Sequence, residues 1–166
     1  TFVPENLAHF GKYTTARQKM GVEVLYAPFY VSMDDVLDRR LDEMDAVYIT
    51  RYYVAEAYLQ KIKEKGKKVI FNNADLHFLR EMRAALQNGK DEEKLTAALE
   101  TRVRELRVCN SVDAILTYNA TEHAVITSHI LDAEKLHITP WVLEEKQPGP
   151  SFEKREGIVF LGGFNH

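Results

Sequence analysis

The stretch Asp45–Asn73, DAVYITRYYVAEAYLQKIKEKGKKVIFNN, contains a strand, a helix and a second strand in that order. The runs Asp45–Arg51 and Lys68–Asn72 are short and rich in apolar residues, as buried parallel strands are. Between them, Val54–Lys65 has the spacing of an amphipathic helix. Three of its residues are expected to face inward: Ala57, Leu59 and Ile62. This order predicts a right-handed β-α-β unit.

The alternation of strands and helices continues in both directions from this unit. Further strands are expected at Thr1–Pro4, Val22–Pro28, Asp113–Tyr118, Leu136–Thr139 and Ile158–Gly162. Further helices are expected at Tyr13–Met20, after a Ser32 cap, at Leu76–Gln87, from Asp91 to Cys109, and from Asn119 to Ile130. The predicted fold class is therefore α/β, a Rossmann-like, doubly wound and mostly parallel sheet with flanking helices.

The long helix ending at Cys109 is expected to direct one apolar stripe into the core. The residues of that stripe are Leu95, Leu99, Val103 and Leu106. The run Arg102–Arg107, which mixes arginines with Glu105 and apolar residues, is interpreted as a solvated helix face. Cys109 itself is interpreted as an inert core residue.

Composition excludes several classes of function. The 166 residues include 22 Lys and Arg against 25 Asp and Glu, a net charge of −3 that gives no reason to expect a nucleic-acid partner. A single cysteine fits a reducing compartment, so a cytoplasmic location is expected. No apolar run approaches the ~20 residues of a membrane span. The six histidines show no metal-ligand spacing, so no metal is expected.

Polar groups follow the expected strands where each one ends, which is the ligand edge of a parallel sheet. Asp75 and His77 form the sharpest pair, because a carboxylate and an imidazole two residues apart can position a hydroxyl group. The alternative is that Asp75 only caps the helix and His77 is exposed in its first turn. Arg51 with Tyr52 could bind a phosphate or a sugar, or could simply cover the sheet edge.

Two further groups of residues lie after later strands. Asn119 and Glu122 are candidates for substrate binding, although their spacing also suffices for a helix start. Gly162 and Gly163 follow the last expected strand, where backbone amides could approach a phosphate. A tight turn would use the same two glycines.

Four segments in order resemble the retaining glycosyltransferases of family 4, which have the GT-B fold. The run Val69–Glu81, VIFNNADLHFLRE, carries the strongest likeness. The segments before and after it that share the likeness are Asp45–Glu56, Asp113–Glu122 and Gly157–His166. GT-B enzymes close two Rossmann-like domains around a cleft, with the acceptor on the first and the nucleotide sugar on the second.

The resemblance implies a retaining transfer of sugar from a nucleotide-sugar donor to a glycan, a lipid-linked acceptor or another hydroxyl group. His77 and Asp75 would then be catalytic. Arg51, Tyr52, Arg80, Asn119 and Glu122 would bind substrate, and Gly162 and Gly163 would lie near the donor diphosphate. Such enzymes are generally metal-independent and need no cofactor, and protein cations and helix dipoles stabilise the diphosphate. A lipid-linked acceptor would bring peripheral contact with a membrane.

The same resemblance implies that the chain is a fragment. Residues 1–143 would form the acceptor-side domain without its first strand, residues 144–157 a linker, and residues 158–166 the start of the nucleotide-sugar domain. The fragment is expected to be inactive alone. An empty central strand position would expose sheet edges, and Ile158–Gly162 is expected to fill it within the chain or in a swapped homodimer. The alternatives are a sugar-nucleotide epimerase with the same fold and a non-catalytic α/β binding module.

Overall fold

A computed structural model describes residues 1–87, 89, 91–144 and 149–160. The helices in this part of the chain are α1 Lys12–Lys19, α2 Met33–Arg40, α3 Tyr52–Glu64, α4 His77–Gln87, α5 Glu92–Ser111 and α6 Ala120–Thr127, with short 3-10 turns η1 Leu41–Glu43 and η2 Phe152–Lys154. The strands are β1 Ala46–Thr50, β2 Lys68–Asn73, β3 Ala114–Thr117 and β4 Leu136–Ile138.

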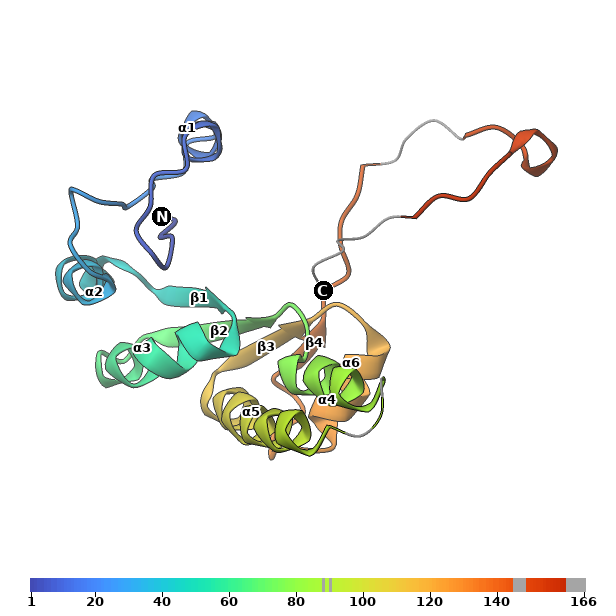
Figure 1. Cartoon of the computed structure of the whole chain (residues 1–166). Coiled ribbons are helices and arrows are strands. Elements are labelled where there is room, and N and C mark those ends of the chain that lie inside the picture. The colour runs from blue at the N-terminus through green and yellow to red at the C-terminus, as the bar shows by residue number, and fades with distance from the viewer. Residues whose placement is uncertain (88, 90, 145–148, 161–166) are drawn as a thin grey trace.

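The strands form one parallel sheet in the order β1-β2-β3-β4. Alternate residues of each strand point to the same face, and Ile49, Phe71 and Ile115 lie side by side on the buried one. Helices α3, α4, α5 and α6 lie on one side of the sheet (Figure 1). The structure therefore has the predicted α/β, Rossmann-like architecture of a parallel sheet flanked by helices.

The core is divided into a large cluster and a small one. The large cluster joins strand residues to helix residues such as Ala55, Val108 and Ile126. The small cluster gathers Leu7, Leu25, Tyr30 and Val36 near the N-terminus. Partly buried Met33 packs against both clusters, so α2 links the N-terminal segment to the sheet.

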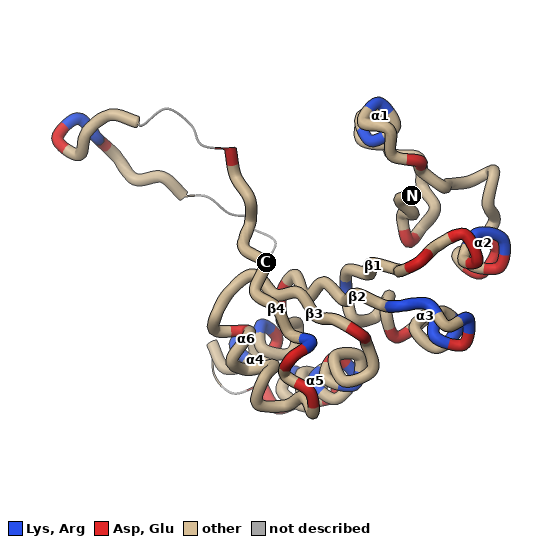
Figure 2. The backbone as a smooth tube through the Cα atoms, turned by 180° about the vertical axis from the view of Figure 1, so that it is seen from behind, with Lys and Arg blue, Asp and Glu red and all other residues tan. Residues whose placement is uncertain are grey.

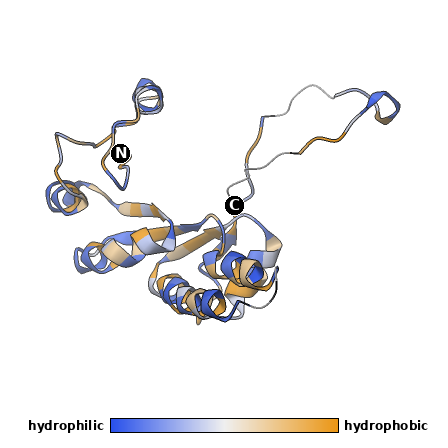
Figure 3. Ribbon diagram, in the orientation of Figure 1, coloured by the Kyte–Doolittle hydropathy of each residue, from blue (hydrophilic) through white to orange (hydrophobic). Residues whose placement is uncertain are grey.

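Charge and hydropathy follow this layering. Lys and Arg lie among Asp and Glu on helices such as α2 and α3 (Figure 2), and apolar colour appears on the strands and on parts of the helices (Figure 3). Helices α2, α3, α4 and α5 each carry residues of both signs. In the described part of the chain, no helix combines the length and the apolar character needed to cross a membrane.

Two strands expected near the N-terminus do not form. Thr1–Pro4 and Val22–Pro28 are reduced to a single parallel bridge between Phe2 and Val24. The physical reason is that these segments have no adjacent strand among the described residues to extend their pairing, because a groove separates the bridge from β1. The last expected strand, Ile158–Gly162, is also not seen: residues 158–160 lie outside any strand and are exposed, and residues 161–162 lie outside the described part.

The buried faces of two helices differ from the expected ones. In α3, Ala55 is fully buried and Ala57 is exposed, whereas Leu59 and Ile62 are buried as predicted. In α5, Leu99 and Val103 are exposed. Its buried residues are Ala98, Thr101, Glu105, Val108 and Cys109. The helix is rotated from its most apolar stripe because Glu105 reaches the start of α4, as described next.

Candidate functional site

The carboxyl ends of β1, β2 and β3 meet at one edge of the sheet because the strands are parallel. The segments that leave this edge begin with Arg51, Ala74 and Tyr118. They bring together side chains that are far apart in the sequence. We call the group Arg51, Asp75, His77, Arg80, Glu105 and Glu122 the sheet-edge cluster.

Arg51 enters this cluster through an unusual backbone conformation. Its φ angle of 77° is positive, and it is one of two non-glycine residues with positive φ among those described. Such a conformation costs on the order of 1–3 kcal/mol and is concentrated at functional sites. It aims the guanidinium toward the next loop, where Nη1 lies 3.4 Å from Asp75 Oδ1 and 3.2 Å from His77 Nε2.

Asp75 connects two cations. One carboxylate oxygen pairs with Arg51 and the other accepts a hydrogen bond from Arg80 Nη1. The side chains of Arg51 and Arg80 are both more than two-fifths exposed. Asp75 therefore holds two partly solvated arginines beside each other, and partly exposed guanidinium groups of this kind can donate to an anion from solvent.

His77 is the first residue of α4, and its residue exposure is only 8%. The alternative of an exposed first-turn histidine is therefore wrong. Its Nδ1 lies 3.1 Å from Glu105 Oε1 and its Nε2 faces the Arg51 guanidinium. Arg51 can only donate and an ionised carboxylate can only accept. A neutral imidazole with its proton on Nδ1 satisfies both contacts, and Nε2 is then an acceptor.

Glu105 anchors this arrangement, and sequence reasoning missed it. The residue is completely buried in the middle of α5. Besides the imidazole contact, its carboxylate accepts the backbone N–H groups of His77 at 3.2 Å and Phe78 at 3.2 Å. These are two of the unpaired donors at the start of α4. The interpretation of Arg102–Arg107 as a solvated face is therefore wrong at Glu105.

A sequence signal for Glu105 did exist. Thr101 precedes it by four residues, and Val108 and Cys109 follow it by three and four. Residues at these spacings share one face of a helix, and these three are small or apolar. Cys109 is a free thiol whose burial raises its pKa to about 12, in accord with the inert core residue predicted.

Two tyrosines at the start of α3 cover the imidazole. The Tyr52 ring is buried and meets the His77 ring edge-on, with centroids 5.1 Å apart. The Tyr53 ring lies 6.4 Å from the same imidazole, also edge-on. Edge-to-face packing is a favourable geometry for such rings. Tyr52 thus restrains His77 rather than presenting its own face to solvent.

Glu122 lies on the other flank of the cluster, in the first turn of α6. Desolvation by burial raises the pKa of its carboxyl group, and the nearby charges of Asp75 and Glu105 act in the same direction. Asn73 Nδ2 donates to Glu122 Oε2 at 3.3 Å. Asn119 does not join the cluster. It caps α6 by accepting the Glu122 backbone N–H at 2.8 Å.

Three buried side-chain oxygens at the ends of β2 and β3 have no hydrogen-bond partner among the described residues: Asn72 Oδ1, Asn73 Oδ1 and Thr117 Oγ1. Asn73 and Thr117 are directly paired in register on the buried face of the sheet. On the opposite face, Asn72 Nδ2 donates to the Tyr118 hydroxyl, and the Tyr118 ring stacks on exposed Trp141. Buried acceptors that lack donors are uncommon in folded proteins.

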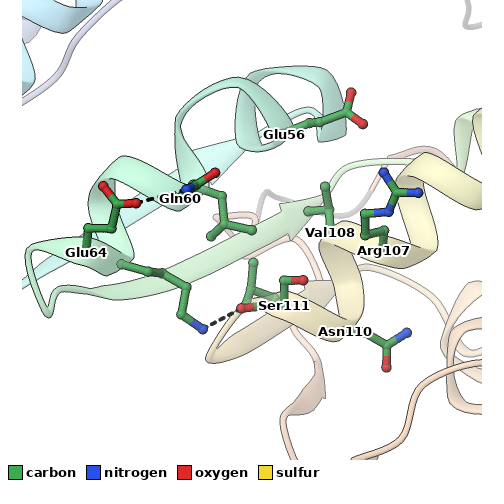
Figure 4. Close-up of a pocket in the computed structure, with 10 residues that line it drawn as sticks. Glu56, Gln60, Glu64, Arg107, Val108, Asn110 and Ser111 are labelled. Carbon is green, nitrogen blue, oxygen red and sulfur yellow. Dashed lines mark hydrogen bonds between the residues drawn. The ribbon is translucent and has the colours of Figure 1, made fainter.

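Other regions offer less chemistry. A groove of about 710 Å³ between α3 and α5 is lined by polar groups that pair with one another, including Gln60 with Glu64 and Lys63 with the Ser111 carbonyl (Figure 4). None of the predicted site residues lines it. Within the described ranges, no cluster of three or more His, Cys, Asp or Glu residues is arranged to hold a metal. Gly162 and Gly163 lie outside these ranges.

Comparison with known proteins does not assign the chain to a family. No protein-family model matches it, and no curated protein or solved structure shows a significant match.

Proposed function

We propose that this chain forms the acceptor-side domain of a retaining glycosyltransferase, and that a nucleotide sugar and a hydroxyl acceptor meet at the sheet-edge cluster. The proposal rests on the order of the four segments that resemble family 4 enzymes and on the α/β fold. The observation that carries it is the position of the His77 ring, whose Nδ1 lies 3.1 Å from Glu105 Oε1, whose edge meets the Tyr52 ring, and whose Nε2 faces Arg51. The single buried thiol of Cys109 supports a reducing, cytoplasmic setting.

The roles of the cluster follow from its hydrogen bonds. A sugar or acceptor hydroxyl would donate to His77 Nε2 once the partly exposed Arg51 turns toward a phosphate. Arg51 and Arg80 would then stabilise the negative charge that grows on the leaving diphosphate. The N-terminus of α4 is not available for this purpose, because Glu105 already neutralises two of its N–H groups. The arginines therefore replace the helix dipole at this position.

A non-catalytic sugar-binding module is the second candidate. The side-chain oxygens of Asn72, Asn73 and Thr117 that lack partners among the described residues support it. Such oxygens can accept hydrogen bonds from a ligand with many hydroxyl groups or from a bound water. Such a module needs the acceptors at the strand ends but has no use for the His77 nitrogen. The two candidates therefore differ in their dependence on His77.

Nuclear magnetic resonance titration of the ¹⁵N-labelled chain with UDP-glucose, GDP-mannose and free glucose tests the proposal. We expect weak binding of at least one nucleotide sugar, with shifts at Arg51, His77 and Glu122. Arg51→Gln should weaken this binding several-fold, whereas Arg83→Gln, an exposed arginine of α4, should not. Unchanged spectra with every ligand would contradict the proposal.

His77→Asn separates the two candidates, because asparagine keeps an acceptor but loses the imidazole. The measurement is the slow release of glucose from UDP-glucose by this domain when it is joined to a donor-binding partner. Under the transferase proposal, the rate of this release should fall at least tenfold in the variant, and the affinity for the nucleotide sugar should stay nearly unchanged. The chain alone should show no turnover. Transfer by these 166 residues alone would refute the division of the site between two domains.

A further inference from the structure

A groove of about 570 Å³ follows the outer edge of β1. One wall is the uninterrupted run 46–51 and the opposite wall is the run 1–5. Apolar side chains of α2 and α3, including Val36, Leu37 and Ile62, line it as well. Because consecutive residues of β1 line the groove, and their side chains alternate between the two faces, the groove runs along the strand edge and not across a face.

Both walls present backbone groups to this groove. The inner edge of β1 pairs with β2, while its outer edge has no strand partner among the described residues. On the other wall, Phe2 donates its N–H to the Glu23 carbonyl at 2.7 Å and accepts from the Leu25 N–H at 3.0 Å. The backbone N–H and C=O groups of Phe2 are thus engaged on the side away from the groove, and the alternation of an extended chain would turn those of Val3 toward it.

A single extended segment with apolar side chains matches these features. It would pair with β1 on one side and with the N-terminal segment on the other, and it would join the Phe2–Val24 bridge to the sheet. Unpaired strand edges are the usual templates for such strand addition. The apolar residues from α2 and α3 would cover its side chains.

The chain itself contains a segment of this kind. Ile158, Val159 and Phe160 are β-branched or aromatic, as strand residues are. Ile158 is fully exposed and Val159 is 91% exposed. This segment follows the long excursion that leaves the β4 side of the sheet, away from the N-terminal segment and β1 (Figures 1 and 3). It does not reach the groove of its own chain.

We propose that the β1-edge groove binds residues 158–160 of a second copy of this chain as an added strand. Two copies exchange these segments reciprocally, which gives a closed, twofold-symmetric dimer. The exchange covers the apolar segment of each copy and the open edge of β1 in the same step. This inference does not depend on the proposed function.

Light scattering coupled to size-exclusion chromatography tests the proposal over a range of concentrations of the full chain. The parent chain should be dimeric at high concentration. Val159→Asp should raise the dimer dissociation constant at least tenfold. Val142→Asp is the matched control, because Val142 is 96% exposed and lies outside the segment. Circular dichroism should show the same helix content in both variants.

Cysteine trapping identifies the occupant directly. Ala46→Cys in the groove wall combined with Val159→Cys should form disulfides between chains, whereas Ala46→Cys with Val142→Cys should not. A parent chain that stays monomeric, equal effects of both aspartate variants, or a disulfide within one chain would each overturn the proposal. A different protein strand in the groove would also overturn it. That outcome would be seen if the Val159→Cys position fails to crosslink while the groove wall remains shielded from solvent.

Discussion

Glu105 shows how one residue can control both a helix start and a candidate catalytic side chain. An isolated buried carboxylate costs several kcal/mol, and this one is compensated by two backbone N–H groups and the His77 imidazole. The same contacts leave His77 Nε2 as the acceptor that faces Arg51. A change at Glu105 should therefore alter stability and the imidazole together.

Glu105→Gln should destabilise the fold by about 1–3 kcal/mol, because the amide NH₂ would face donors that are now satisfied. The proton of His77 should also redistribute between its ring nitrogens. Urea denaturation measures the first effect and ¹⁵N spectra of the imidazole the second. Glu100→Gln, an exposed change on the same helix, should stay within about 0.5 kcal/mol of the parent. Equal behaviour of the two variants would contradict the role given to Glu105.

Glu122 should contribute to the pH dependence of the free energy of unfolding. Burial raises the pKa of its carboxyl group, so the folded state keeps the proton to higher pH than the unfolded state, whose value is about 4.3. The stability contribution of Glu122 therefore falls as pH rises through the folded pKa.

Glu122→Gln should remove this loss. The stability of the variant minus that of the parent should be more favourable at pH 7 than at pH 4. Thermal unfolding of both proteins at both pH values measures this difference. Glu134→Gln, at an exposed position, should show no such difference. A constant offset between Glu122→Gln and the parent at all pH values would rule out the raised pKa.

At the scale of elements, the junction between β1 and α3 places a strained residue in the sheet-edge cluster. Arg51 follows the last residue of β1 and precedes the first residue of α3, with φ of 77°. No side chain caps α3 at this point. The conformation is therefore maintained by the strand before it and the helix after it, and in this conformation the Arg51 side chain contacts Asp75 and His77.

Arg51→Gly and Arg51→Ala separate strain from side-chain contacts. Both variants lose the contacts to Asp75 and His77, but glycine tolerates positive φ and alanine does not. Arg51→Gly should be more stable than Arg51→Ala by about 1 kcal/mol or more, measured by chemical denaturation. An alanine variant as stable as the glycine variant would mean that the junction relaxes without cost.

At the scale of the whole molecule, Asp113 links neighbouring strands of the sheet. Its carboxylate accepts the Val69 backbone N–H at 2.9 Å and pairs with Lys68 at 3.0 Å. The bond from Val69 is the largest cause that lowers the pKa of Asp113. Its stabilising effect is complete above the unfolded value of about 3.9 and is lost as pH falls through the folded pKa.

Asp113→Asn should cost about 1–2 kcal/mol at pH 7, because a hydrogen bond to a charged acceptor is replaced by a neutral one. The difference from the parent should shrink as pH approaches 2. Denaturant titrations at pH 7 and pH 2.5 measure both values. Asp45→Asn, at an exposed site before β1, serves as the control, and a pH-independent cost at Asp113 would argue against the lowered pKa.

Much of the fold was predictable because its signals are local. The β-α-β unit around β1, α3 and β2 was correctly placed, and the Asn119 cap of α6 forms as its spacing indicated. The predictions were wrong where strand pairing or helix burial depends on contacts with distant parts of the chain. Phe2 and Val24 have strand-like surroundings in the sequence but pair only with each other. Leu99 and Val103 carry the apolar stripe of α5 but face solvent.

The candidate site also has features that local sequence predicts and features that only the folded structure shows. The sequence by itself determined the parallel architecture and the strand-to-helix junctions that carry Arg51, Asp75 and His77, because hydrophobic periodicity and turn residues act over a few positions. Only the tertiary structure decided that Glu105 supports His77 and that β1 has an open edge. The support of His77 depends on a contact between residues 28 positions apart, and the open edge depends on which strands pair in the sheet. Burial and hydrogen-bond satisfaction at such distances arise only when the chain is folded.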